Sequence, residues 1–265
     1  MKDSLKTFEI PEGGLMTNKN LVILQARMSS TRLPGKVLAV INDKPMIYWQ
    51  IQRIRRAKNI DELIVATSTE RSDDALADYL ELNGVLVERG PIDDVYERFN
   101  QVLKRRQDVQ TIVRLTGDCP FVMPELIDEM VNRFEFSEAD YLSNVLEPTF
   151  PDGLDVEIVN RTAFLKLGKY PLSATEKEHV TLGLRNRPSE FKIENFSQDF
   201  DLSQLRWTVD YEGDLKFARE IFSEFRGQEA KFSYGDLLRI LKAKPELKNE
   251  VSGSLRNVAL NEIDK

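Results

Sequence analysis

The sequence predicts an α/β fold, a three-layer, doubly wound and mostly parallel sheet with a small inserted α+β segment. Two observations predict the sheet. Short runs such as LVIL at residues 21–24 and LIVAT at 63–67 are continuously apolar, as in strands that helices cover on both faces. Amphipathic helical patterns separate these runs, and such alternation builds parallel strands. After residue 141 the alternation changes, which indicates the inserted segment.

The first half of the chain alternates regularly between the two kinds of element. We expect strands at residues 21–26, 63–67, 85–88 and 111–116. Helices are expected over residues 45–58 and beginning at Ser72, at Asp94 and at Pro124. Ligands bind beyond the carboxyl ends of parallel strands. One edge of the sheet is therefore expected to hold residues 25–36, 67–69, 89–90 and 116–118.

The second half contains the inserted segment and the end of the domain. We expect strands at residues 141–145, 154–159 and 191–196, and a helix over 176–186. The run LRWTV at 205–209 predicts a return to the main sheet, and helices over 214–225 and 233–242 follow it. One domain is thus expected over residues 21–245, between a mobile polar arm at 1–20 and a flexible tail at 246–265.

Composition narrows the classes of function and partner. The net charge of −7 argues against general nucleic-acid binding. The sequence contains no stretch of about 18 apolar residues, so no membrane partner is expected. Cys119 is the single cysteine, which excludes an intrachain disulfide and favours a cytoplasmic setting.

A basic loop directly follows the first expected strand. Arg27, Arg32 and Lys36 alternate there with small residues, and Pro34 and Gly35 favour a fixed loop shape. Three cations and several backbone N–H groups suit an anion with more than one negative charge. The alternative is a solvated loop with incidental charge.

Two aspartates follow expected strands at the same edge of the sheet. Asp118 comes after the strand at 111–116, and Asp210 comes after LRWTV. Beside a phosphate-binding loop, two carboxylates suit Mg²⁺, which is held by one or two carboxylates together with phosphate oxygens and water. The alternative for each aspartate is to cap the helix that follows it.

Further candidates lie in the inserted segment. Asp155 and Glu157 alternate on an expected strand and so share one face, which could equally be a solvated face. Asp152 precedes a glycine and is also a turn signal. His179 is the only histidine and lies near the start of an expected helix. Two roles are considered for Cys119, a nucleophile paired with a histidine and a small packing residue. The packing role is the simpler one.

Five motifs, in order along the chain, resemble those of the cytidylyltransferases known as CMP-sugar synthetases. The first, QARMSSTRLPGK at residues 25–36, is similar to the opening signature of that family. The others resemble most closely the group of spore coat polysaccharide biosynthesis protein F: LTGDCP at 115–120, DGLDVE at 152–157, EHVT at 178–181 and TVDYEGDL at 208–215.

The resemblance implies a fold of the nucleotide-diphospho-sugar transferase type and a set of nucleotide contacts. It implies that Arg27 and Lys36 hold the triphosphate of CTP. It also implies that Asp118 and Asp210 are the ligands of Mg²⁺. These four residues form the expected catalytic set. Nucleotide contacts are expected at Gln25, Ala26, Arg27, Arg32, Gly35, Lys36, Thr67, Ser68, Arg89 and Thr116.

The resemblance also implies the reaction, which is transfer of CMP from CTP to an acidic sugar with release of pyrophosphate. The sugar contacts are expected at Asp152, Asp155, Glu157 and His179. The segment 141–204 is expected to bind this acceptor and to pair two chains into a homodimer. The motifs single out no general base.

Two other functions stay open on the sequence alone. One is a glycosyltransferase of related fold that uses a preformed nucleotide sugar. The sequence shows no Asp-x-Asp motif at a strand end in the middle of the domain, because residues 199–201 lie in a polar connector. The other is a nucleotide-binding protein without catalysis, which would bind CTP and release no pyrophosphate.

Overall fold

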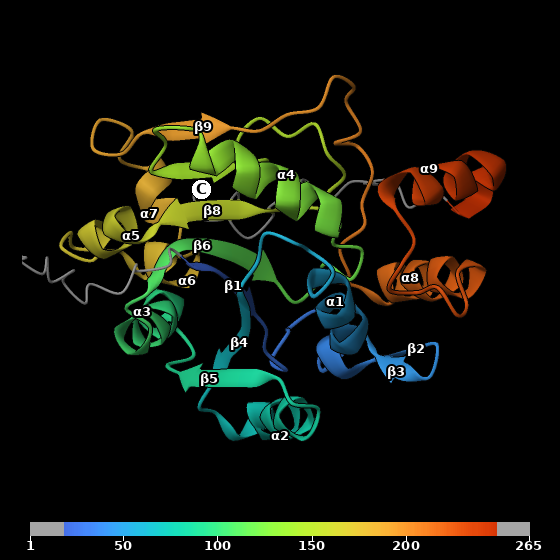
Figure 1. The fold of residues 1–265 in the computed structure, drawn as a ribbon. Coiled ribbons are helices and arrows are strands. Elements are labelled where there is room, and N and C mark those ends of the chain that lie inside the picture. The colour runs from blue at the N-terminus through green and yellow to red at the C-terminus, as the bar shows by residue number, and fades with distance from the viewer. Residues whose placement is uncertain (1–18, 248–265) are drawn as a thin grey trace, which may run out of the picture.

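The computed structural model describes residues 19–247, and its centre is one seven-stranded sheet (Figure 1). The strands lie in the order β5-β4-β1-β6-β8-β7-β9. Their bounds are Lys19–Gln25 (β1), Glu62–Ser68 (β4), Leu86–Gly90 (β5), Val109–Thr116 (β6), Tyr141–Ser143 (β7), Glu157–Asn160 (β8) and Ile193–Asn195 (β9). Only β8 runs against its two neighbours, so the expected mostly parallel sheet is confirmed.

Helices cover both faces of the sheet, which gives the three expected layers (Figure 1). One face packs against α1 (Met46–Ile54), α2 (Asp74–Leu82), α4 (Pro124–Glu135), α8 (Glu212–Glu224) and α9 (Tyr234–Ala243). The other face packs against α3 (Val95–Arg105), α5 (Arg161–Leu167) and α7 (Leu182–Arg185). Side chains of β1 alternate between these two cores, with Val22 and Leu24 in the first and Leu21 and Ile23 in the second.

Several predicted element boundaries are confirmed, and others shift for local reasons. Pro124 begins α4, and Asp94 caps α3 through a hydrogen bond from the Glu97 amide. Ser72 is not a helix cap, because a short 3₁₀ turn, Arg71–Asp73, precedes α2. Helix α5 was not expected, and neither was the short hairpin that β2 (Val40–Ile41) and β3 (Lys44–Pro45) form.

The segment 141–204 extends the main sheet. Its strands β7, β8 and β9 pair onto β6 through β8, so the segment builds no second sheet. The helix expected over 176–186 is two shorter ones, α6 (Ala174–Glu178) and α7, because Val180 between them has a left-handed backbone with φ of 44°. Asp155 precedes β8, so the expectation that Asp155 and Glu157 share a strand face was wrong.

The prediction that residues 205–209 form a strand of the main sheet was also wrong. These residues make one isolated bridge, between Arg206 and Asp152, and the Val209 amide donates to the Asp118 carbonyl at 2.8 Å. That contact nevertheless brings the backbone before Asp210 next to the end of β6.

The folded domain was predicted to begin at residue 21 and to end at residue 245. Lys19 and Asn20 already belong to β1, so the structured part begins before residue 21. The rest of the expected arm, residues 1–18, and residues 248–265 of the expected tail lie outside the described residues. No helix within residues 19–247 has the length and apolar character needed to cross a membrane.

Candidate active site

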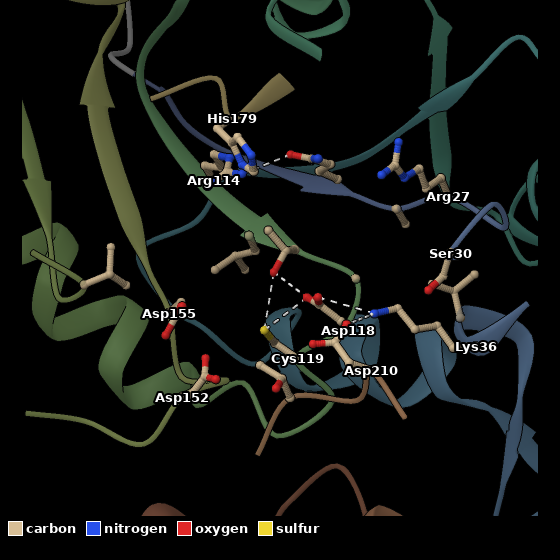
Figure 2. Close-up of a pocket in the computed structure, with 18 of the residues that line it drawn as sticks. Arg27, Ser30, Lys36, Arg114, Asp118, Cys119, Asp152, Asp155, His179 and Asp210 are labelled. Carbon is tan, nitrogen blue, oxygen red and sulfur yellow. Dashed lines mark hydrogen bonds and ion pairs between the residues drawn. The ribbon is translucent and has the colours of Figure 1, made fainter. Parts of the chain in front are cut away.

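A polar cavity of about 740 Å³ opens at the carboxyl ends of β1 and β6 (Figure 2). The loop after β1, the turn after β6, the segment before β8, helices α6 and α7, and residues 206–211 all contribute to its walls. In Figure 2, Arg114 and His179 lie on one side and Asp152 and Asp155 on another, while Asp118 and Asp210 face Lys36. This is the edge of the sheet at which the sequence predicts a ligand site.

The loop after β1 is held in shape by one buried carboxylate. Asp73 is fully buried and accepts hydrogen bonds from the Met28 amide at 2.7 Å and from the Thr67 hydroxyl and Ser68 amide at 3.0 Å each. Burial opposes ionisation of this carboxyl, but the bonds from Ser68 and Met28 outweigh it and hold its pKa below the usual value. Asp73 therefore ties the loop to the end of β4.

Lys36 lies between the two predicted metal ligands. Its ammonium nitrogen is 2.9 Å from Asp210 Oδ1 and 3.4 Å from Asp118 Oδ2. Burial alone would lower the pKa of Lys36, but the two carboxylates outweigh it and raise that pKa. Burial likewise opposes ionisation of Asp118, yet Lys36 and the Thr116 hydroxyl lower the pKa of Asp118 to about 2. Asp118 is therefore ionised at neutral pH, and its carboxylate converges with that of Asp210 on one cation.

Asp210 is the meeting point of three cations. Arg32 donates to its Oδ1 at 2.7 Å and Arg206 to its Oδ2 at 2.7 Å, in addition to the contact with Lys36. Arg206 also contacts Asp152 at 3.1 Å and Asp214 at 3.5 Å. The guanidinium of Arg206, buried in the stretch that was predicted to return to the main sheet, thus links the candidate metal ligand Asp210 to the DGLDVE segment.

Next to this network, the backbone at Asp152 and Gly153 packs closely against the backbone of Trp207. The Trp207 amide donates to the Asp152 carbonyl at 2.6 Å. Gly153 has φ of 109°, and a Cβ placed on it would lie 2.6 Å from the Trp207 carbonyl carbon. Only glycine fits this position without a shift of the backbone.

A second charge network lines the wall that β6, β7 and β8 form. Arg114 forms an ion pair with Glu157, and its Nη2 donates to Gln25 Oε1 at 3.2 Å. Glu157 Oε1 also accepts from the hydroxyls of Tyr141 and of Thr181, the latter at 2.6 Å. Burial raises the pKa of the Glu157 carboxyl, but Arg114 outweighs it, so the pKa lies below its usual value. Glu157 thus accepts hydrogen bonds from three side chains, and its ion pair holds Arg114 in position.

His179 ends helix α6 rather than beginning a helix. Its ring lines the cavity half-buried, and burial followed by the charge of Arg114 lowers its pKa. A neutral imidazole at this position offers one donor and one acceptor to a ligand. Its neighbour Glu178 lies 3.5 Å from Arg27, which connects the α6 side of the cavity to the loop after β1.

Most of the predicted site residues line the cavity. Those residues are Gln25, Ala26, Arg27, Arg32, Lys36, Thr116, Asp118, Asp152, Asp155, Glu157, His179 and Asp210. Cys119 lines it too, but burial raises the pKa of its thiol well above the ordinary value, which fits a packing role and not a nucleophile.

Four predicted nucleotide contacts do not line the cavity. Thr67 and Ser68 are fully buried and donate to Asp73. Arg89 pairs with Asp74 at 2.7 Å and donates to the Ser68 carbonyl at 2.8 Å. Gly35 shapes the loop, since it has φ of 75° and its amide donates to the Met28 carbonyl at 2.9 Å. The structure thus gives these four residues roles in holding the walls.

Among the cavity residues that were not predicted as site residues are Arg114, Thr181 and Arg185. Arg114 carried a usable signal, because an arginine inside the apolar run TIVRLT must find a partner once it is buried. Thr181 and Arg185 follow His179 in the chain, and the break between α6 and α7 that brings them to the cavity has no clear signal in the sequence.

The donor set fits a Mg²⁺ ion that also binds phosphate. Within residues 19–247 no cluster of three or more His, Cys, Asp or Glu side chains could hold a metal by protein ligands alone. Mg²⁺ needs no such cluster, because it is usually bound by one or two carboxylates with phosphate oxygens and water. Asp118 and Asp210 offer two carboxylates, and Lys36 already marks a cation position between them.

Comparison with known proteins agrees with this geometry. Residues 21–234 match the family model described as cytidylyltransferase. The chain belongs to the cytidylyltransferase family. This cytidylyltransferase is therefore a nucleotidyltransferase enzyme, and the family match covers every residue of the cavity.

Individual relatives support the same assignment. The spore coat polysaccharide biosynthesis protein SpsF of Bacillus subtilis is 32% identical over 240 residues, which cover 88% of this chain and 98% of that protein. A cytidylyltransferase from Leptospira borgpetersenii superposes with a TM-score of 0.82 at 30% identity, over 90% of this chain and 99% of that one.

A more distant structure shares the fold. It is a CMP:2-keto-3-deoxy-manno-octonic acid synthetase complexed with CTP, with a TM-score of 0.61 and 18% identity over 78% of this chain and 99% of that one.

Proposed function

We propose that this cytidylyltransferase transfers CMP from CTP to an acidic sugar, with release of pyrophosphate. The observation that carries the proposal is the convergence of Asp118, Asp210 and Lys36 beside the basic loop after β1. A basic wall and a pair of aspartate side chains together suit a magnesium nucleotide. The distant relative with bound CTP acts, by its name, on a sugar acid, and the SpsF relative serves polysaccharide biosynthesis.

The loop after β1 binds the phosphates of the nucleotide. Arg27, Arg32 and Lys36 reach the cavity from a backbone that Asp73 fixes in place. Their charges stabilise the negative charge that collects on the departing pyrophosphate. Such stabilisation supplies most of the catalysis in phosphoryl-type transfer, together with alignment of the reactants.

Asp118 and Asp210 hold the divalent ion. When bound, Mg²⁺ neutralises phosphate charge and favours attack at phosphorus. Arg206 holds Asp210 from the side opposite Lys36, because each cation contacts a different oxygen of this carboxylate. Arg206 is therefore a positioning residue for the metal ligand.

The acceptor sugar occupies the part of the cavity that Asp152, Asp155 and His179 line. Its hydroxyl oxygen attacks the α-phosphorus of CTP and forms the new P–O bond. The bond from the α-phosphorus to the bridging oxygen breaks, pyrophosphate leaves, and the hydroxyl proton passes to solvent. The residues of this wall orient the hydroxyl, and alignment of this kind can contribute roughly 7–11 kcal/mol to lowering a barrier.

Pyrophosphate release tests the proposal. Purified protein is assayed with each of the four nucleoside triphosphates, Mg²⁺ and a panel of sugar acids, beside the Asp118→Asn variant. Release that requires CTP, Mg²⁺ and one acid, and that falls at least 100-fold in the variant, supports the proposal. Transfer from a preformed nucleotide sugar would instead indicate a glycosyltransferase, and CTP binding without release for any acid would indicate a nucleotide sensor.

We propose further that the enzyme is a homodimer that pairs through segment 141–204. Strand β9 of this segment is the last strand of the sheet, so its outer edge has no neighbouring strand within the described residues. Light scattering during size-exclusion chromatography gives the mass in solution, and 30.5 kDa would contradict the dimer. The cytoplasmic setting expected from the single cysteine stays a prediction.

A further inference from the structure

Within residues 19–247, six arginine and lysine side chains line the cavity, and five of them have a carboxylate partner. Asp210 binds three of the five, which are Arg32, Lys36 and Arg206. Arg27 lies 3.5 Å from Glu178, and Arg114 forms the ion pair with Glu157. These five charges are compensated before any ligand enters.

Arg185 is the sixth cation and differs from the others. It lines the cavity half-buried at the end of α7, yet no ion pair or side-chain hydrogen bond links it to any other residue in 19–247. The charge of Arg185 acts on the phenol of Tyr141. Burial and Glu157 raise the pKa of the Tyr141 phenol, and Arg185 acts against them. Arg185 therefore lies close enough to Tyr141 of β7 for its charge to act on that phenol.

An uncompensated charge in a partly desolvated wall is costly unless an anion occupies the cavity. Arg185 also ends α7, where a cation favours the helix dipole, but α7 has only four residues, so this effect is small. A cation that only stabilised the end of α7 would not need to lie in a cavity wall. The position of Arg185 is better explained by an anionic ligand.

We propose that Arg185 binds the carboxylate of the acceptor sugar and thereby selects sugar acids over neutral sugars. The proposal rests on the function proposed above. The nucleotide phosphates have their own cations on the loop after β1, whereas Arg185 comes from the segment that carries His179 and Thr181. Arginine pairs with a planar carboxylate through two parallel N–H donors, which makes it a selective reader of this group.

Direct binding tests the assignment without turnover. The wild-type protein is saturated with a CTP analogue that has a methylene between the α- and β-phosphorus, and is titrated with 2-keto-3-deoxy-manno-octonate and with N-acetylneuraminate. Each acid is compared with its carboxamide. We expect at least one acid to bind about 10- to 100-fold more tightly than its carboxamide, as the loss of a hydrogen-bonded charge predicts.

The Arg185→Gln variant is expected to lose this preference. Its affinity for the acid falls to that of the carboxamide, while its affinity for the CTP analogue stays within about 2-fold of wild type. Arg185→Lys keeps the charge without the fork of donors and is expected to lose roughly 3- to 10-fold. Arg133→Gln is the matched control, since Arg133 is 60% exposed on α4 and outside the cavity.

Three results would overturn the assignment. One is wild-type protein that binds the CTP analogue and neither acid. Another is Arg185→Gln that still distinguishes acid from carboxamide. A third is an equal loss of CTP and acid affinity, which indicates a structural role. If Arg185→Gln does not fold, the Arg185→Lys variant is used instead. An affinity of Arg185→Lys for the acid that equals that of wild type would then refute the contact.

The same experiments separate this inference from the proposed function. Acid binding that depends on Arg185 without any pyrophosphate release would uphold the carboxylate site and reject the transferase. Pyrophosphate release with an acceptor whose KM does not change in Arg185→Gln would uphold the transferase and reject the site.

Discussion

Replacing Glu157 with glutamine tests how its ion pair with Arg114 in the cavity wall supports the fold. The side chains of Arg114 and Glu157 are only 11% and 7% exposed, so the change leaves a guanidinium charge buried without its counter-charge. The neutral amide must also turn its NH₂ group toward one of the three donors that the carboxylate now satisfies. Breaking a buried pair from one side costs about 3–5 kcal/mol. For a chain of this size that lowers the Tm by about 6–20 °C.

The effect has a defined dependence on pH. The pKa of Glu157 is lower in the folded protein than its ordinary value of 4.5, because Arg114 and its hydrogen bonds outweigh burial. The carboxylate therefore stabilises the fold above the unfolded-state pKa, and this contribution is lost as the pH falls through the folded-state pKa. As the pH falls below the ordinary glutamate pKa of 4.5, the stability of Glu157→Gln should fall less steeply than that of wild type.

Urea titrations at pH 7 and across the acid range measure both effects. Glu62→Gln is the matched control, because the pair of Glu62 with Arg106 is 30% and 22% exposed and should be worth no more than about 1 kcal/mol. Removing both charges in Arg114→Met/Glu157→Gln should cost less than the sum of the single changes, by roughly 0.5–3 kcal/mol. A loss below 1 kcal/mol in Glu157→Gln, or additive single changes, would refute the reasoning.

Three other outcomes concern catalysis. Lys36→Met should lower kcat/KM for pyrophosphate release by roughly 10²–10³-fold, and a loss under 10-fold would remove Lys36 from the reaction. Chelation by EDTA should stop release and added Mg²⁺ should restore it, so turnover in EDTA would contradict the metal assignment to Asp118 and Asp210. Gly153→Ala places a Cβ 2.6 Å from the Trp207 backbone and should raise the acceptor KM about 10-fold without changing the KM for CTP. Equal changes in both KM values would show a general disturbance.

Much of the fold follows from local patterns. The apolar run of β1 is continuous, Arg114 alone interrupts the apolar core of β6 at residues 112–115, and the charged loop after β1 comes directly at the end of a strand. Position along the sheet edge then brings Asp118 near Lys36. Asp210 reaches the site by another route than expected, because residues 206–209 attach by backbone bonds to Asp152 and Asp118 and not as a strand of the sheet.

The remaining parts of the site depend on contacts that local patterns do not contain. Thr67 and Ser68 follow a strand as ligand residues do, but Asp73 is close enough in sequence and space to accept their hydrogen bonds first. Arg114 and Arg206 each interrupt an apolar run, which predicts a buried partner without naming it. The partners Glu157 and Asp152 lie more than forty residues away in the chain, so only the tertiary structure identifies them.

The bonds from Met28, Thr67 and Ser68 to Asp73 have a consequence for the energetics of turnover. A loop of small residues that became ordered only on contact with phosphate would lose conformational entropy in every catalytic cycle, at roughly 1–2 kcal/mol for each residue fixed. Because Asp73 fixes this loop during folding, that loss occurs once in the lifetime of the molecule. Substrate affinity then need not be weakened by an ordering step, and association need not wait for one.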